Sequence, residues 1–143
     1  MTRYRNAFTL VEVLIVVVIL GILASIVVPQ FAGATSDAQQ SAMADQIGKI
    51  RRAMAVYYVR NGNVYPTITA GDGTWGEMLS PTSPYMRKPP VNMWIGGVNA
   101  KVIVIGVAPD SAFQTDHGWI YNPVTGDVWA GGFDGDDKPY PRP

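Results

Sequence analysis

The sequence predicts an α+β fold, in which a long N-terminal helix packs on a small antiparallel sheet of about three strands. Three observations predict it: an uncharged apolar run over residues 13–28, an apolar seam with helical spacing behind it, and short β-branched and aromatic segments near the end of the chain. The 143 residues are enough for one small folded unit plus one extended element.

The first half of the helix is long enough to cross a membrane. An apolar run over residues 8–28 is interrupted only by Thr9, Glu12 and Ser25. About 21 helical residues span roughly 30 Å, the thickness of the hydrocarbon core of a bilayer. Arg3 and Arg5 precede the run without an acid, which predicts a cytoplasmic N-terminus and an exported remainder of the chain.

Glu12 is the residue that a plain membrane anchor does not explain. An ionised carboxylate at membrane depth costs about 3 kcal/mol or more unless a cation pairs with it. A cut between Ala7 and Phe8 would create an α-amino group about one helical turn from Glu12, and a neighbouring subunit would carry the same amine. The position of Glu12 therefore predicts an assembly contact.

The second half of the helix is predicted to be amphipathic. Its apolar residues recur at steps of four and three, which gives one narrow helix face: Met43, Ile47, Ile50, Met54 and Tyr57. Gly62 follows as a left-handed helix cap. Upstream, Gly21 and Pro29 are expected to disturb the helix, because proline lacks the amide donor and crowds the preceding turn.

Strand patterns occupy the last part of the chain. A connector rich in proline, with room for one short helix near residues 75–79, comes first. Residues 101–107 are β-branched, and residues 118–121 and 127–130 flank a turn of sequence Asn-Pro-Val-Thr-Gly. One face of the resulting sheet can bury the helix seam.

The composition argues against several functions. Eleven basic and eleven acidic residues leave no positive field for nucleic acid. His117 is the single histidine, cysteine is absent, and no glycine-rich phosphate loop precedes a helix, so we expect no enzyme. We expect core or subunit-contact roles for the four tryptophans rather than stacking platforms, and a surface or turn role for His117.

Asp134, Asp136 and Asp137 form the one cluster of hard oxygen ligands. Calcium favours carboxylates on a flexible, glycine-containing loop, although the spacing is not that of an EF-hand. Two interpretations stay open, a solvated acidic tail and a calcium site. No other cofactor is expected.

The N-terminal residues resemble a known signal. Ala-Phe-Thr-Leu-Val-Glu at 7–12, followed by the apolar run, resembles the class III prepilin signal of type IV pilin-like proteins, and Pro29 stands where that family has a helix-kinking proline. Residues 118–130 are similar to the terminal hairpin of type II secretion pseudopilins. Two positions depart from the pattern: Ala7 replaces a common glycine, and residues 90–94 read Pro-Val-Asn-Met-Trp where the major pseudopilin has Asp-Pro-Trp-Gly-Asn-Pro.

The resemblance implies a pilin-like ladle and a processing route. A prepilin peptidase would cut after Ala7 and Phe8 would be N-methylated, while Gly21 and Pro29 would allow local melting of the helix during assembly. It also lends support to calcium in the acidic loop. The implied segments are a leader, a membrane and filament-core helix, an amphipathic helix, a connector and the sheet with its acidic loop, at residues 1–7, 8–29, 30–61, 62–100 and 101–143.

The function implied is that of a structural pseudopilus subunit which drives protein export by type II secretion. Its partners would be further copies of itself, other pseudopilins, the prepilin peptidase, an inner-membrane platform with its ATPase and, before assembly, the lipid bilayer. The precursor would cross the bacterial inner membrane once, with a periplasmic C-terminal domain, and the filament would lie in the periplasm or outside the cell.

Three alternatives remain at this point. The chain could be a type IV pilus subunit for adhesion, motility or DNA uptake. It could be an exported soluble binding protein, cut after the small-x-small sequence at 32–34 so that Thr35 becomes the first residue. The third is a single-pass anchor for an unrelated exterior domain.

Overall fold

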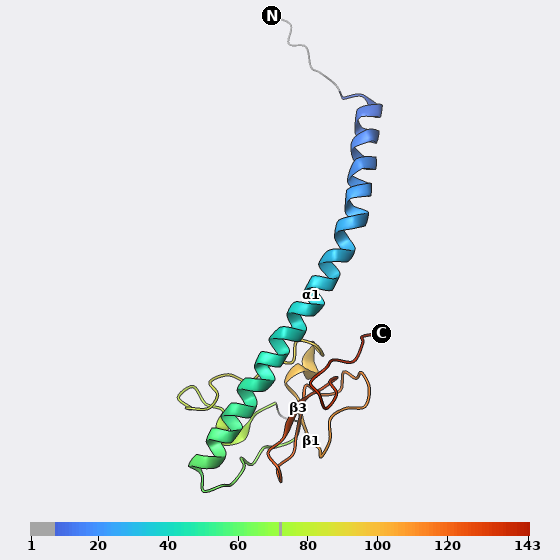
Figure 1. Cartoon of the computed structure of the whole chain (residues 1–143). Helices are drawn as coiled ribbons and strands as arrows, with labels where there is room; N and C mark the ends of the chain where they lie inside the picture. Colours follow the sequence, from blue (N-terminus) through green and yellow to red (C-terminus); the bar gives the residue numbers. More distant parts are fainter. Residues whose placement is uncertain (1–7, 72) are drawn as a thin grey trace, which may run out of the picture. The chain divides into compact units, whose positions relative to one another are not determined.

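The computed structural model describes residues 8–71 and 73–143, and the side chains at positions 29–33 lie outside this description. The chain divides after Asp37 into two compact units, which we treat separately. Figure 1 shows the order of the elements, which confirms the α+β class. They are helix α1 (Leu10–Arg60), the 3₁₀ turns η1 (Gly76–Met78) and η2 (Val98–Lys101), and strands β1 (Ile103–Ile105), β2 (Trp119–Tyr121) and β3 (Val128–Ala130).

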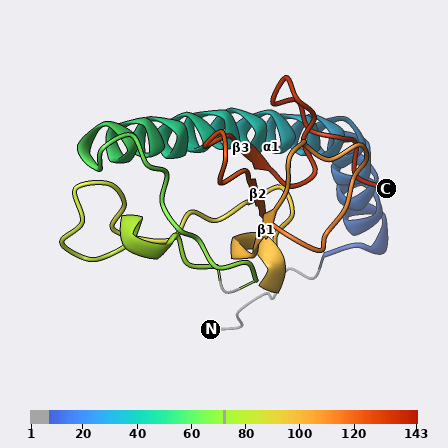
Figure 2. The same cartoon turned by 90° about the horizontal axis from the view of Figure 1, so that it is seen from below.

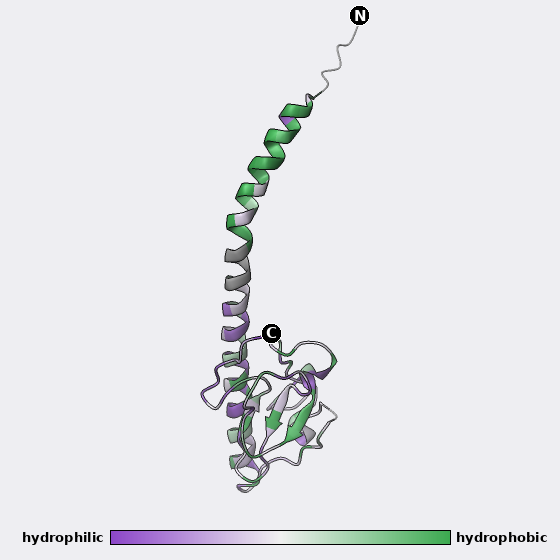
Figure 3. Ribbon diagram, turned by 90° about the vertical axis from the view of Figure 1, so that its right-hand side faces the viewer, coloured by the Kyte–Doolittle hydropathy of each residue, from purple (hydrophilic) through white to green (hydrophobic). Residues whose placement is uncertain are grey.

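The first unit contains the apolar part of α1. The segment Leu10–Val28 is long and apolar enough to cross a membrane, and none of it is buried within the protein. Figure 3 shows apolar residues along this whole part of the helix. The large apolar side chains are 44% to 82% exposed, so no partner within the described chain covers them.

Helix α1 is unbroken at both positions where loosening is expected. It runs as α-helix through Gly21 and Pro29. Ser25 donates its hydroxyl to the Ile22 carbonyl at 2.7 Å, a side-chain bond back to the helix backbone one turn before the proline. Melting at Gly21 and Pro29 therefore stays a prediction about the assembled state.

The second half of α1 has the predicted apolar seam. Its five residues are between 0% and 6% exposed, and all belong to the core of the second unit. The helix ends at Arg60, and Gly62 takes a φ of 69°. The Asn63 amide donates to the Tyr58 carbonyl at 2.9 Å, which closes the left-handed helix cap expected at Gly62.

The sheet has three strands in the order β1-β2-β3, but it is mixed. Strands β2 and β3 form the predicted antiparallel hairpin, with Ile120 opposite Trp129. The predicted antiparallel direction is wrong for β1, which pairs with β2 in parallel and sets Val104 opposite Ile120. The reason is the length of the connection, since residues 106–118 provide the dozen or so residues that a parallel crossover needs.

The core of the second unit lies between α1 and the sheet. Figure 2 shows the second half of α1 along the sheet, with β3 the nearest strand. Trp75 and Trp119 meet edge to face with ring centroids 6.1 Å apart, and Trp94 meets Phe133 at 5.9 Å. These three tryptophans are at most 7% exposed, which confirms their core role.

Candidate functional site

The N-terminal end of α1 holds Glu12 in a reciprocal cap. The Thr9 amide and the Thr9 hydroxyl both donate to Glu12 Oε2 at 2.8 Å, and the Glu12 amide donates to Thr9 Oγ1 at 3.2 Å. This is a capping box, with Thr9 as the N-cap. Sequence reasoning missed it, although the spacing Thr-x-x-Glu just before an apolar run is its signature.

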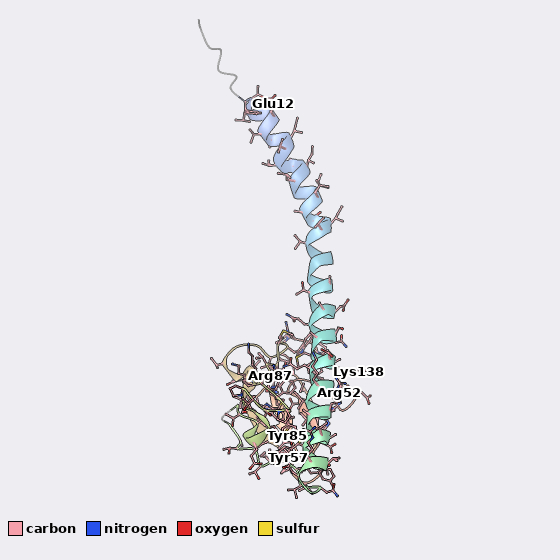
Figure 4. All side chains as sticks on the ribbon, turned by 90° about the vertical axis from the view of Figure 1, so that its left-hand side faces the viewer. Glu12, Arg52, Tyr57, Tyr85, Arg87 and Lys138 are labelled. Atoms are coloured by element: carbon pink, nitrogen blue, oxygen red, sulfur yellow. The ribbon has the colours of Figure 1, made fainter. Side chains whose placement is uncertain are left out.

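The cap changes the interpretation of Glu12. Figure 4 shows Glu12 in the first turns of α1. Within the described part of the chain, the hydrogen bonds to its carboxylate converge on Oε2. Among residues 8–71 and 73–143, no donor bonds the other carboxylate oxygen, Oε1. Phe8, 86% exposed, lies next to Thr9, whereas Ala7 lies outside the described residues.

The acidic loop is fastened to α1 by Arg51. The Arg51 guanidinium contacts both oxygens of Asp137, at 2.5 and 2.9 Å, and donates to the Val128 carbonyl at 2.9 Å. Asp134 Oδ1 accepts the amides of Asp136 and Lys138, both at 2.9 Å. This loop is thus ordered by an arginine fork and by its own backbone.

The three aspartates do not converge on one point. Within residues 8–71 and 73–143, no three acidic or histidine side chains gather as a metal site would require. Asp137 already has a cation partner in Arg51. Calcium would have to draw these carboxylates together to gain the several oxygen ligands it needs, and calcium binding stays a prediction.

His117 lies at the entrance of β2, where its Nε2 is 3.3 Å from a carboxylate oxygen of Asp110 but makes no hydrogen bond within the described part of the chain. The other Asp110 oxygen accepts the Gly132 amide at 2.7 Å and the Gln114 side-chain amide at 2.8 Å. This group joins the β1–β2 connection to the end of β3. The turn role expected for His117 fits this position.

Asn92 is a buried polar residue that sequence reasoning did not single out. Its Nδ2 donates to the carbonyls of Gly118 and Gly131, both at 2.9 Å, and its Oδ1 accepts the amides of Trp94 and Ile95. All its polar atoms are satisfied at 0% exposure. The stretch at 90–94 therefore fixes the connector to the sheet.

The fold and its N-terminal site define a prepilin-like protein, with a capped glutamate at the start of an apolar helix and a small α+β unit behind it. The family described as "Prokaryotic N-terminal methylation motif" matches residues 2–28. Among curated proteins, the chain is similar to "Type II secretion system core protein G" of Dickeya chrysanthemi, with 31% identity covering 81% of this chain and 85% of that protein.

Two further relatives have the same name. The protein of Vibrio cholerae is 37% identical over 64% of this chain and 67% of its own length, and that of Klebsiella pneumoniae is 30% identical over 81% and 92%. The chain belongs to the type II secretion system core protein G family. It is a structural subunit of a type II secretion pseudopilus, and the alternatives are not favoured. The apolar helix and the family together indicate anchoring in the inner membrane. No solved structure matches the chain significantly.

Proposed function

We propose that the chain is made as a precursor that spans the inner membrane once through Leu10–Val28. Its first residues lie in the cytoplasm, where Arg3 and Arg5 favour retention, and its second unit lies in the periplasm. A prepilin peptidase cuts between Ala7 and Phe8, and Phe8 becomes the methylated first residue. The methylation motif over residues 2–28 supports this processing.

Assembly replaces lipid contacts of the apolar helix with contacts between copies. The exposed apolar side chains of Leu10–Val28 can pack on neighbouring helices in the filament core. Glu12 then sets the axial register, because its carboxylate meets the new α-amino group of Phe8 on an adjacent copy. The observation that carries this proposal is the capping box, which holds the Glu12 carboxylate at the helix start through Oε2, while no described residue donates to Oε1.

Gly21 and Pro29 serve as the points where the helix uncoils as copies stack. Glycine adds backbone freedom in a helix interior, and proline removes one helical hydrogen bond. Helix α1 is continuous at both positions in the isolated chain. Uncoiling would thus accompany assembly, and the change in helix content on polymerisation measures it.

The filament works with further partners. These are other pseudopilins, a membrane platform and a cytoplasmic ATPase, which lift subunits out of the bilayer so that the growing filament exports folded proteins. Membership of the core protein G family favours the major subunit over a minor one. We assign no reaction to the chain, and its role is structural.

Calcium is a separate proposal for the loop around Asp134 and Asp136. Binding there would have to compete with Arg51 for Asp137. Addition of calcium to the full chain in detergent should raise its unfolding temperature if the ion binds. The absence of a shift would count against the site.

Intact mass measurement of the mature protein tests the proposed function. A chain that begins with N-methylated Phe8, recovered from sheared filaments, is the expected result. A mature chain that begins at Thr35 would instead identify a soluble exported protein. Retention of residues 1–7 in filaments would overturn the pairing of Glu12 with an α-amino group.

A further inference from the structure

A groove lies in the second unit between α1 and the loop at residues 84–90. It has a volume of about 630 Å³ and an apolar floor that includes Ile50, Ala53, Val56 and Met86. Basic side chains stand at its edge: Lys49, Arg52, Arg87 and Lys88. Figure 4 shows Arg52 on the helix and Arg87 on the facing loop. The groove therefore favours an occupant with an apolar tip and a carboxylate.

The positive charge of this edge is only partly neutralised. Lys49 pairs with Asp45 at 2.6 Å, one helical turn away. Among the described residues, the other three edge cations make no ion pair. Arg87 and Lys88 are exposed. A carboxylate that enters the groove would find cations on both walls.

The turn between β2 and β3 has the complementary chemistry. It presents Val124 with 82% of its surface exposed, and Asp127 is also exposed. Asn122 makes the turn rigid, because its Oδ1 accepts the Val124 amide at 3.0 Å and its carbonyl accepts the Gly126 amide at 2.8 Å. An exposed apolar side chain on a preorganised turn loses little entropy when it docks.

The turn and the groove lie on different sides of the same unit. A Cβ on Gly126 would come within 2.1 Å of the Tyr65 ring, so the turn packs close to the segment that follows the end of α1. Arg51 bonds the Val128 carbonyl just behind the turn. Arg51 is two positions after the groove residue Lys49, so at about 100° per residue it points about 200° round the helix, to nearly the opposite face. One copy cannot fill its own groove.

We propose that the β2–β3 turn of one copy docks in the groove of the next copy, with Val124 on the apolar floor and Asp127 against the cations of Arg87 and Lys88. This inference rests on the proposed function, because it names the contact between exterior units in the same filament. Two different surfaces of each copy meet, so the contact is heterologous and propagates into an open helical polymer rather than a closed pair.

Cysteine cross-linking in assembled filaments tests the contact, since the chain has no cysteine of its own. Val56→Cys on the groove floor is combined with Val124→Cys, and both positions are exposed enough for the replacement to leave the fold intact. Oxidised filaments should give a ladder of covalent multimers. The matched control combines Val124→Cys with Val98→Cys, which is 93% exposed and does not line the groove. The control should remain monomeric.

Charge reversal provides an independent test. The pair Arg87→Glu and Lys88→Glu should reduce filament yield roughly tenfold, because like charges then face each other across the contact. Asp127→Lys in the same chain should restore the yield. Thermal unfolding of each variant checks that the unit still folds.

The outcomes separate this inference from the proposed function. Normal filaments without cross-links between positions 56 and 124, cross-links equally strong in the control, or no rescue by Asp127→Lys would each overturn the docking contact and leave the pseudopilus role intact. Failure of the unmodified chain to form filaments would overturn the proposed function.

Discussion

The two halves of helix α1 differ in what covers their apolar side chains. In Leu10–Val28 the large apolar side chains are 44% to 82% exposed, whereas the seam from Met43 to Tyr57 is at most 6% exposed. The second half is buried by the sheet and connector of its own chain. The first half has no such cover, so its partners must be lipid or other copies. One continuous helix therefore stabilises a fold at one end and awaits assembly at the other.

The largest expected effect concerns the exposed half. Glu12→Ala should allow cleavage after Ala7 but abolish filaments, because it removes the carboxylate that we propose pairs with the new α-amino group. Mass measurement of the mature chain and electron microscopy of sheared filaments check both parts. Thr9→Ala is the matched control, since it removes the two hydroxyl bonds of the cap but keeps the Glu12 charge and the backbone bond, and its filaments should form. Normal assembly of Glu12→Ala would refute the pairing mechanism.

Substitutions in the buried half of α1 should affect the stability of the second unit, whereas substitutions in the exposed half should not. Ile50→Ala should lower the free energy of unfolding of the second unit by about 2–5 kcal/mol, because Ile50 is 1% exposed and a cavity would replace its side chain. Val17→Ala in the apolar segment should change that free energy by less than about 0.5 kcal/mol. Thermal or denaturant unfolding of the full chain in detergent compares them. A similar decrease in the free energy of unfolding for both variants would contradict the claim that only the second half of α1 stabilises the fold.

Alkaline pH should lower the stability of the second unit. The hydrogen bond from the Tyr57 hydroxyl to Glu77, with burial, raises the pKa of Tyr57 to about 12, and burial raises the pKa of Tyr121 to about 12. Above the ordinary value of 10.0, the unfolded chain loses these protons first. The contribution of these two tyrosines to the free energy of unfolding is therefore complete below pH 10 and is lost between about pH 10 and 12.

Unfolding temperature against pH measures this fall, and tyrosinate absorbance follows the titration. Tyr57→Phe should remove part of the pH dependence, since the ring stays but the titrating hydroxyl is gone. An unfolding temperature that does not change up to about pH 12 would contradict the raised pKa values of Tyr57 and Tyr121.

The smallest expected effect distinguishes two ion pairs on the same stretch of α1. Arg51→Ala should lower the free energy of unfolding by about 1 kcal/mol. Arg51 bonds both Asp137 oxygens and the Val128 carbonyl, although its side chain is 41% exposed. Lys49→Ala should cost less than about 0.5 kcal/mol, since the Lys49–Asp45 pair is an exposed pair within the helix. An equal decrease in stability for the two variants, measured by thermal unfolding, would show that Arg51 does not hold the acidic loop.

Sequence reasoning succeeded where the pattern is local. The apolar seam, the cap at Gly62 and the β2–β3 hairpin all follow from side-chain period and turn chemistry within a few residues. The membrane segment follows from its length and apolar composition. These features required no knowledge of distant contacts.

The features that the sequence did not predict depend mostly on contacts between distant parts of the chain. The parallel pairing of β1 depends on the path of residues 106–118, which no local pattern specifies. Arg51 and Asp137 are 86 positions apart, so their pair could not be read from spacing. The cap at Thr9 and Glu12 is different, because its Thr-x-x-Glu signature lies within four residues and can be read from the sequence alone.

The exposed apolar half of α1 has a consequence for how subunits are stored and exchanged. Transfer of Leu10–Val28 into water would cost tens of kcal/mol, at about 1.5–3 kcal/mol for each large apolar side chain. A subunit thus passes between bilayer and polymer without dissolving. If filaments grow from the membrane as proposed, the supply for growth is set by the number of molecules per area of membrane.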